Sequence, residues 1–310
     1  MVGKGWLRKK VLSLVLCVAV MLSVMVVGAG AAFSDQSKIK NTEAVDMCVA
    51  LNIIGGYGDN TYRPENNITR AEVCKMICVA LNGGKEPTLS VPATPTFKDV
   101  RNDANSSWAE KYIESCVAQG IVGGVGNGMF QPSQNVTGSQ LAKMLLVALG
   151  YKADIAGFGG NGWDTKVNVV ASAKGLYEDL ESIDTSAALT RDSAAQMLWN
   201  ALNAYEVEYK TVLTTDANGQ LTTEVTVQDK VVGSNNDKIT LMEDKYESKT
   251  TIGVLTKYEW NESDKTFDYT IGSDRTETVD GESVTIKAPI FQSDDDFSCL
   301  LYTSDAADEL

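Results

Sequence analysis

The sequence of 310 residues contains no histidine. This absence excludes Ser-His-Asp and Cys-His arrangements for nucleophilic catalysis, and every zinc, copper or non-haem iron site that has a histidine ligand. The sequence also lacks a Cys-x-x-Cys pair, so it does not support a cysteine metal site. We therefore expect a protein with no metal, no cofactor and no catalytic residues among these positions.

Positive charge is scarce as well. The chain has 27 Lys and Arg residues against 41 Asp and Glu residues, which gives a net charge of −14. Nucleic-acid binding needs a basic face, so we expect no nucleic-acid partner. With 44% hydrophobic and 22% charged residues, the composition is typical of a folded globular protein.

Long apolar runs are absent except near the N-terminus. A basic stretch is followed by the apolar run Val11–Val27 and by the small residues Gly28–Ala32. This pattern is typical of a secretory signal peptide over residues 1–32, with an A-x-A-like site at residues 29–31. The run is slightly long for a signal peptide, so an uncleaved membrane anchor is the alternative. In either case we expect an exported protein.

The C-terminal stretch Cys299–Glu309 reads CLLYTSDAADE and resembles the translation of a transposase adapter used in sequencing libraries. We treat residues 299–310 as an artefact and expect the natural protein to continue past Ser298. Without this stretch and residues 1–32 the net charge becomes −15, of which −5 falls in residues 33–210 and −10 in residues 211–298.

Four cysteines lie between these two ends. An even number in an exported chain suggests disulfides. However, Cys74 and Cys78 are four residues apart on one expected helix face inside apolar runs, which favours buried free thiols. We extend this interpretation to Cys48 and Cys116.

Three related segments dominate the middle of the chain. Residues 52–82 match residues 120–150 without a gap at an offset of 68, and residues 175–203 form a third copy whose loop is two residues shorter. A helical run precedes each copy, at residues 43–51, 108–119 and 163–174. The repeating unit is therefore a helix, a glycine-rich loop and a second helix.

The second helix of each copy has a clear start. Thr69 and Glu72 form the pattern of a capping box, and Thr137 and Gln140 repeat it. Thr190 has Ser193 three residues later, so the box of the third copy is incomplete. An apolar stripe follows each cap, so we expect the copies to pack together. Its members are Val73, Ile77, Ala80, Leu81, Leu141, Leu145, Ala148, Leu149, Ala194, Leu198, Ala201 and Leu202.

Capping does not explain Arg70 and Arg191, which both follow a capping threonine directly. A cation at that position costs a few tenths of a kcal/mol against the helix dipole. A helix start with unpaired N–H groups and an arginine nevertheless suits an anion. The alternative is a solvated arginine. The second copy has Gly138 at this position, so an anion site is weakened or absent there.

These segments resemble S-layer homology repeats, which hold proteins on bacterial cell walls. The resemblance covers residues 33–210 and is looser in the third copy. It rests on the stretches Ile68–Glu72, Gly55–Asp59, Arg63-Pro64, Phe97–Val100, Trp108, Tyr112-Ile113 and the opening Phe33–Asp35.

The resemblance implies a spindle of three pseudo-symmetric units whose grooves bind an anionic, pyruvylated secondary cell-wall polysaccharide. The ligand-binding residues that it suggests are Arg70, Arg191, Trp108, Asp99, Thr69 and Thr190. Trp108 and Trp163 suit either stacking on sugars or core packing. Gly138 departs from the pattern, which puts one of the three grooves in doubt.

Two loops complete the repeat region. Residues 83–96 hold three of the six prolines and are expected to form an extended linker. The loop at residues 58–60 lacks the spaced carboxylates of an EF-hand, so we expect no calcium there.

From Thr211 onwards β-branched residues alternate around a turn at residues 216–219, as in a β-hairpin. Further strands are expected at residues 238–242, 251–260, 266–271 and 283–286. The run Asp294–Asp296 is interpreted as a solvated stretch rather than a cation site.

The expected fold class is a mainly α pseudo-three-fold bundle of helix–loop–helix units, followed by an incomplete antiparallel β-rich region. The expected segments are a signal peptide (1–32), repeat 1 with its linker (33–90), repeat 2 (91–153), repeat 3 (154–210), the β-rich region (211–298) and the artefact (299–310).

We expect a secreted, non-catalytic protein of the bacterial cell surface that binds wall polysaccharide. One alternative is a wall or polysaccharide hydrolase whose catalytic domain lies beyond this sequence. The other is a lattice or adhesin subunit that self-associates in a surface layer.

Overall fold

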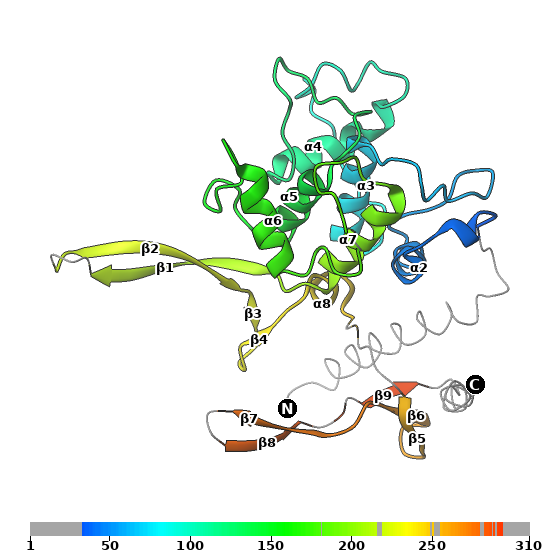
Figure 1. The fold of residues 1–310 in the computed structure, drawn as a ribbon, viewed down its shortest axis with the longest axis vertical. Coiled ribbons are helices and arrows are strands. Elements are labelled where there is room, and N and C mark those ends of the chain that lie inside the picture. The colour runs from blue at the N-terminus through cyan, green and yellow to red at the C-terminus, as the bar shows by residue number, and fades with distance from the viewer. Residues whose placement is uncertain are drawn as a thin grey trace. The chain divides into compact units, whose positions relative to one another are not determined.

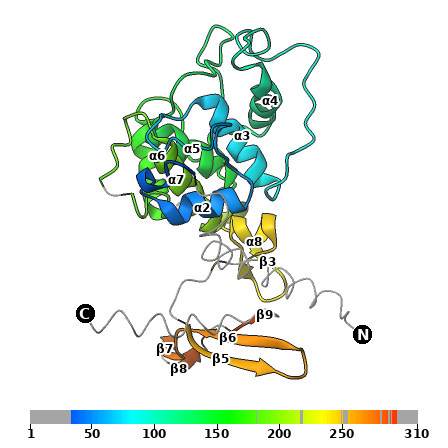
Figure 2. The same ribbon diagram turned by 90° about the vertical axis from the view of Figure 1, so that its right-hand side faces the viewer.

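The structure is a computed structural model that describes residues 33–180, 182–215, 219–248, 250, 255–279, 282–286, 288 and 290–293. The expected signal peptide, the hairpin residues 216–218, the run Asp294–Asp296 and the residues from 299 lie outside these ranges. The chain divides into two compact units, one ending at Tyr246 and the other beginning, after that point, at Glu247. Figure 1 and Figure 2 show the helices of the first unit and the sheets of the second.

Helices followed by small antiparallel sheets confirm the expected fold class. Each repeat supplies a first helix and a second, more buried helix, at the positions that the sequence predicts. Repeat 1 has η2 (Gln36–Lys38), α2 (Thr42–Ala50) and α3 (Arg70–Leu81); repeat 2 has η3 (Ser107–Ala109), α4 (Glu110–Ala118) and α5 (Gly138–Ala148); repeat 3 has α6 (Trp163–Ala173) and α7 (Arg191–Asn203).

The second helices begin as predicted. The Thr69 and Thr137 side chains accept hydrogen bonds from the backbone N–H groups of Glu72 and Gln140, and both capping boxes are complete. Thr190 caps α7 without the box. The apolar stripe is buried apart from Leu81 and Ala148, which are half-buried. These three faces form the core of the repeat unit.

A closed ring of backbone hydrogen bonds joins the three repeats. Leu189 N–H donates to the Val136 carbonyl oxygen at 2.8 Å, Val136 N–H to that of Ile68 at 3.0 Å, and Ile68 N–H to that of Leu189 at 3.0 Å. Each residue directly precedes a capping threonine, and each side chain is buried. The ring gives the pseudo-three-fold arrangement its geometry, because each repeat both donates and accepts once.

The four cysteines Cys48, Cys74, Cys78 and Cys116 are buried free thiols, which confirms the packing interpretation. The Sγ atoms of Cys78 and Cys116 lie 3.6 Å apart. Residues 85–96 contain no helix or strand, as expected for the linker. No helix among the described residues is long and apolar enough to cross a bilayer.

The first unit continues past the third repeat. Strands β1 (Val207–Thr215) and β2 (Leu221–Asp229) form the expected hairpin, followed by the short pair β3 (Val231–Val232) and β4 (Asp237–Lys238). Val207 N–H donates to the Leu149 carbonyl oxygen at 2.8 Å, which attaches β1 to the end of α5.

One expected strand is wrong. Of residues 238–242 only Lys238 lies in a strand, and α8 (Leu241–Tyr246) follows. Thr240 and Glu243 cap this helix reciprocally: Glu243 N–H donates to Thr240 Oγ1, and Thr240 N–H donates to Glu243 Oε2. The Thr-x-x-Glu pattern was present in the sequence, but the β-branched residues before it favoured a strand.

The second unit contains two small antiparallel sheets. In one, β6 (Thr266–Ile271) lies between β5 (Leu255–Asn261) and β9 (Ile290–Ser293); the other pairs β7 (Arg275–Val279) with β8 (Glu282–Ile286). The strands β5, β6 and β8 agree with the sequence within the described residues. The sequence did not predict β7 and β9.

Candidate functional site

The arginine at the start of α3 crosses to the loop of the next repeat. Arg70 donates from Nε to the Phe130 carbonyl oxygen at 3.0 Å and from a terminal nitrogen to that of Gly123 at 2.8 Å. Its guanidinium carbon lies 4.2 Å from the centre of the Phe130 ring. The side chain is only 9% exposed, so Arg70 clamps the loop of repeat 2 instead of extending into solvent.

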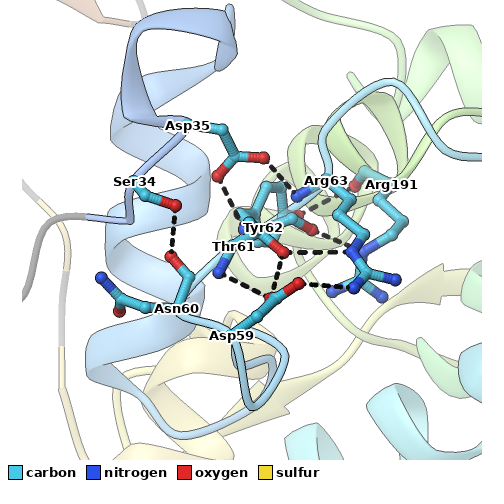
Figure 3. Close-up of polar contacts among 8 residues, drawn as sticks. All are labelled: Ser34, Asp35, Asp59, Asn60, Thr61, Tyr62, Arg63 and Arg191. Atoms are coloured by element: carbon cyan, nitrogen blue, oxygen red, sulfur yellow. Dashed lines mark hydrogen bonds and ion pairs between the residues drawn. The ribbon is translucent and has the colours of Figure 1, made fainter.

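Arg191 makes the same contact one repeat further on. It donates from Nε to the Tyr62 carbonyl oxygen at 3.1 Å (Figure 3). A terminal nitrogen donates to the Gly55 carbonyl oxygen, also at 3.1 Å. The other terminal nitrogen lies 3.6 Å from a Glu72 carboxylate oxygen. Arg191 therefore joins α7 of repeat 3 to the loop of repeat 1.

The expectation of unpaired N–H groups at these helix starts is wrong. Arg70 and Ala71 donate their backbone N–H groups to the carbonyl oxygens of Gln134 and Pro132. Arg191 and Asp192 likewise donate to Asn66 and Pro64. The neighbouring loop takes the donors that an anion would use at a free helix end. An anion bound at these positions would therefore have to be held by the guanidinium groups and not by the helix N–H groups.

Asp99 and its counterpart Asp35 hold the loops from the opposite side. The carboxylate oxygens of Asp99 accept the backbone N–H groups of Phe130 and Gln131 at 2.9 and 2.8 Å. Asp35 accepts those of Tyr62 and Arg63, both at 2.8 Å (Figure 3). Burial opposes ionisation of Asp35, but these two N–H donors, its own backbone N–H group and the charge of Lys38 together lower its pKa. Both aspartates position a loop.

The loop of repeat 1 gathers two guanidinium groups around one aromatic ring. The Tyr57 ring centre lies 4.0 Å from the Arg63 guanidinium carbon and 5.0 Å from that of Arg191. Arg63 also pairs with Asp59 at 2.8 Å, and its side chain is 42% exposed. We name Tyr57, Arg63 and Arg191 the first-loop site. Sequence reasoning missed Tyr57 and Arg63 as site residues, although both belong to the stretches that carry the resemblance.

The corresponding loop of repeat 2 has no such group of charges. At the fixed offset of 68 residues, Tyr57, Asp59 and Arg63 become Val125, Asn127 and Gln131. Arg70 is therefore the one arginine at this junction, and it faces an aromatic ring that is itself buried.

The third junction, where the start of α5 in repeat 2 meets the loop of repeat 3, has no arginine and is closely packed. Ser139 donates from its backbone N–H and from Oγ to the Thr185 carbonyl oxygen, at 2.8 and 3.1 Å. A Cβ atom on Gly138 would lie 2.8 Å from Thr185 Cα, so no larger residue fits there without movement. Gly138, which stands where the other two repeats have an arginine, therefore lies against the loop of repeat 3, which is two residues shorter than the others. The three junctions are thus chemically different.

A cleft of about 610 Å³ lies between repeats 1 and 3. It adjoins the first-loop site along the chain, because Pro64 and Asp192 among its lining residues follow Arg63 and Arg191. Two lysines and four acidic residues line it: Lys38, Lys40, Glu65, Asp179, Asp184 and Asp192. At its edge Asn41 Nδ2 donates to Asp192 at 2.7 Å, and burial raises the pKa of Asp192. The sequence did not single out these two lysines or Asn41.

The remaining predicted site residues are dispersed. Trp108 is 45% exposed, donates from Nε1 to the Asn105 carbonyl oxygen and lies edge-on to Tyr112. Trp163 is half-buried, with the Lys143 ammonium 5.4 Å from its ring centre. Thr69 and Thr190 use their hydroxyl groups to cap helices. The structure therefore brings Arg191 and Thr190 to the cleft and its border, and leaves Trp108 on another repeat.

Sequence comparison identifies the class of this fold. The profile of the S-layer homology (SLH) domain matches residues 32–74 and 96–142. The chain is 28% identical over 178 residues to the "Surface layer protein" of Brevibacillus choshinensis, which covers 56% of this chain and 16% of that protein. It is 36% identical over 87 residues to the "Cellulosome-anchoring protein" of Acetivibrio thermocellus, covering 28% and 19%.

An enzyme is also among the relatives. An "Endoglucanase" of a Bacillus species is 30% identical over 154 residues, covering 46% of this chain and 15% of the enzyme. The alignments thus span less than a fifth of each of these three relatives.

The profile matches repeats 1 and 2, whereas repeat 3 is assigned from the internal sequence repeat and its helices. The chain carries SLH repeats and is similar over this region to proteins of the bacterial cell surface.

Proposed function

We propose that the three-repeat unit anchors the protein non-covalently to the bacterial cell wall by binding an anionic secondary cell-wall polysaccharide. The observation that carries the proposal is the first-loop site, in which two guanidinium groups lie within 5.0 Å of one tyrosine ring. Guanidinium groups suit carboxylate ligands, and an aromatic ring suits the face of a sugar.

Because the chain has a net negative charge, its attraction to an anionic polymer must come mainly from the first-loop site. The chain as a whole carries −14, so it is repelled by an anionic polymer at long range. Within the site, Asp59 and Glu72 offset part of the charge of Arg63 and Arg191. A polymer carboxylate, such as that of a pyruvyl ketal, would compete with these two side chains for the arginines. We therefore expect binding to weaken with salt.

The three junctions take different parts in this proposal. The junction of repeats 1 and 3 is the principal binding site. The junction of repeats 1 and 2, with Arg70, contributes less because the loop of repeat 2 has Val125 and Gln131 where repeat 1 has Tyr57 and Arg63. Trp108 adds a stacking surface on repeat 2. Thr69, Thr190 and Asp99 act by positioning helices and loops.

Retention on purified cell-wall sacculi tests the proposal. The full chain should sediment with intact sacculi and remain in solution with sacculi stripped of their non-peptidoglycan polysaccharides. Equal retention on both preparations would contradict the polysaccharide claim. The double substitution Arg70→Ala with Arg191→Ala should release the protein. Unchanged retention of that variant would contradict the role of the arginines.

These two arginines also hold the loops of the neighbouring repeats. A variant that keeps their hydrogen bonds to the loop carbonyl oxygens is therefore needed as well. Arg63→Gln removes an exposed charge from the first-loop site, and we expect retention to fall while helical circular dichroism stays unchanged. Arg101→Gln is the matched control, because Arg101 pairs with Glu110 outside the site. Equal retention of both variants would remove Arg63 from the site.

Anchoring accounts for the chain better than catalysis does. The endoglucanase relative aligns over only 15% of its length, and we propose that this shared part serves attachment in both proteins. The residues after Tyr246 would then be the part that the anchor carries. The hydrolase alternative places its catalytic domain outside this sequence, so reading the gene past the codon of Ser298 separates the two hypotheses. A catalytic domain encoded there would favour the hydrolase alternative.

A further inference from the structure

The β1–β2 hairpin is a two-stranded ribbon that leaves the helical body (Figure 1). Its register is antiparallel and unbroken, from Val207 opposite Asp229 to Thr215 opposite Leu221. No third strand pairs with it among the described residues. Its base is fixed, since Lys152 N–H donates to the Tyr209 hydroxyl at 3.1 Å.

The register divides the side chains into two unlike faces, because opposed residues share a face and alternate pairs point the same way. One face carries charged residues: Glu208, Lys210 and Glu224. The other has no charged side chain beyond Asp229 at the base, and we call it the uncharged face. It consists of Tyr209 with Val227, Thr211 with Val225, Leu213 with Thr223, and Thr215 with Leu221.

The uncharged face is open to solvent. Leu213 is 71% exposed and Leu221 is 77% exposed, and both valines are 47% exposed. An apolar, β-branched ribbon with two free edges and no charge on one face lacks the features that keep exposed strands from associating. A two-stranded hairpin is also marginal in water without a partner for its apolar face.

We propose that this face packs against the same face of the hairpin in a second copy of the chain. Two copies that each carry −14 repel one another, so the favoured contact is one that brings no charges together. The uncharged face meets this condition against itself. An anionic polysaccharide is a poor occupant, because the cations near the face all lie at its base: Lys152 beside the Tyr209 ring, and Lys174 and Lys238, which are paired with Asp229.

The size of the face sets the strength of the contact. Nine-residue strands are about 30 Å long and two strands about 10 Å wide, so two such faces bury about 600 Å² in total. This is half of the roughly 1,200 Å² at the lower end for stable complexes, so the pairing is weak and concentration-dependent. Wall attachment would raise the local concentration and strengthen it, and this last step alone rests on the proposed function.

Sedimentation of the full chain in solution tests the pairing without any wall material, so its outcome is independent of anchoring. The mass should rise with protein concentration. Leu213→Lys should lower the association constant about tenfold or more, since it places two like charges in the contact. Val212→Lys is the matched control: this neighbour is 44% exposed on the opposite face and should leave association unchanged.

A mixing experiment distinguishes charge repulsion in the contact from a hairpin that the substitution has disordered. Leu213→Lys and Leu213→Glu should each stay monomeric, and an equimolar mixture should associate again through the complementary charges. A second variant pair uses a bismaleimide cross-linker, with Cys17→Ser and Cys299→Ser in both variants, since the four described cysteines are buried. Thr223→Cys on the uncharged face should give dimers, and Thr222→Cys on the other face should not. A monomer at every concentration, or equal behaviour of the two members of either matched pair, would overturn the proposal.

Discussion

Arg191 and Tyr62 lie 129 residues apart in the sequence, yet Nε of the arginine donates to the tyrosine carbonyl oxygen at 3.1 Å. Arg70 and Phe130 repeat this contact at the preceding junction. Arg191 therefore has two roles: it joins repeat 3 to the loop of repeat 1, and it supplies positive charge to the candidate binding site. The first role is a matter of stability, and the following predictions separate it from the second.

Arg70→Ala should destabilise the repeat unit by about 2–3 kcal/mol, because two buried hydrogen bonds from a charged group are lost. Arg70→Lys should recover less than half of this loss, since an ammonium group does not match the fork that reaches both carbonyl oxygens. Urea unfolding followed by helical circular dichroism measures the difference. A midpoint of Arg70→Ala equal to that of the unsubstituted chain would show that the clamp has no energetic role.

Gly138→Ala should also destabilise, by about 1–3 kcal/mol, through overpacking. On helix propensity alone the substitution would stabilise by about 1 kcal/mol, so the sign is the test. The reason is the 2.8 Å approach of the added Cβ to Thr185 Cα. Gly58→Ala is the control, because nothing lies within 4 Å of its added Cβ. A more stable Gly138→Ala variant would mean that the loop of repeat 3 moves aside freely.

Asp35→Asn should remove a stabilisation that depends on pH. The pKa of Asp35 in the folded chain is lowered from its ordinary value of 3.8: burial opposes the shift, and backbone N–H groups, chiefly those of Tyr62 and Arg63, together with the charge of Lys38 outweigh it. The ionised form is therefore favoured by folding. Its contribution is fully present above pH 3.8 and disappears as the pH falls through the lowered value.

Urea unfolding of both chains over a pH series measures this effect. Asp35→Asn should be less stable than the unsubstituted chain at neutral pH, and the two should converge in acid. The exposed Asp237 on β4 supplies the control substitution Asp237→Asn. A difference that stays constant down to the most acidic pH would show that the carboxylate charge does not matter.

The thiols of Cys48, Cys74, Cys78 and Cys116 should resist alkylation in the folded chain. Burial raises the pKa of Cys48 to about 12, so its reactive thiolate is scarce at neutral pH. Peptide mapping by mass spectrometry should find these four residues alkylated only after unfolding. A peptide pair linked through Cys78 and Cys116, which are 3.6 Å apart, would contradict the free-thiol state.

Much of the local structure was predictable. The capping threonines, the complete boxes at Glu72 and Gln140 and the incomplete one at Ser193 all occur as the sequence indicates, because a cap depends on residues three positions apart. The stripe behind each cap is buried for the same local reason. The strand expected at residues 238–242 failed because two local signals competed, and the cap at Thr240 prevailed.

The sequence by itself determined the number of repeats, their helices and the absence of histidine chemistry. It also placed Arg70 and Arg191 at helix starts. The tertiary structure decided what those arginines do, because their acceptors are carbonyl oxygens 53 to 136 residues away. It also decided that Gly138 and the shortened third loop belong to one contact, and that Arg63 joins Arg191 around Tyr57. Such relationships depend on which repeat adjoins which, and the ring of Ile68, Val136 and Leu189 establishes that order only in the folded chain.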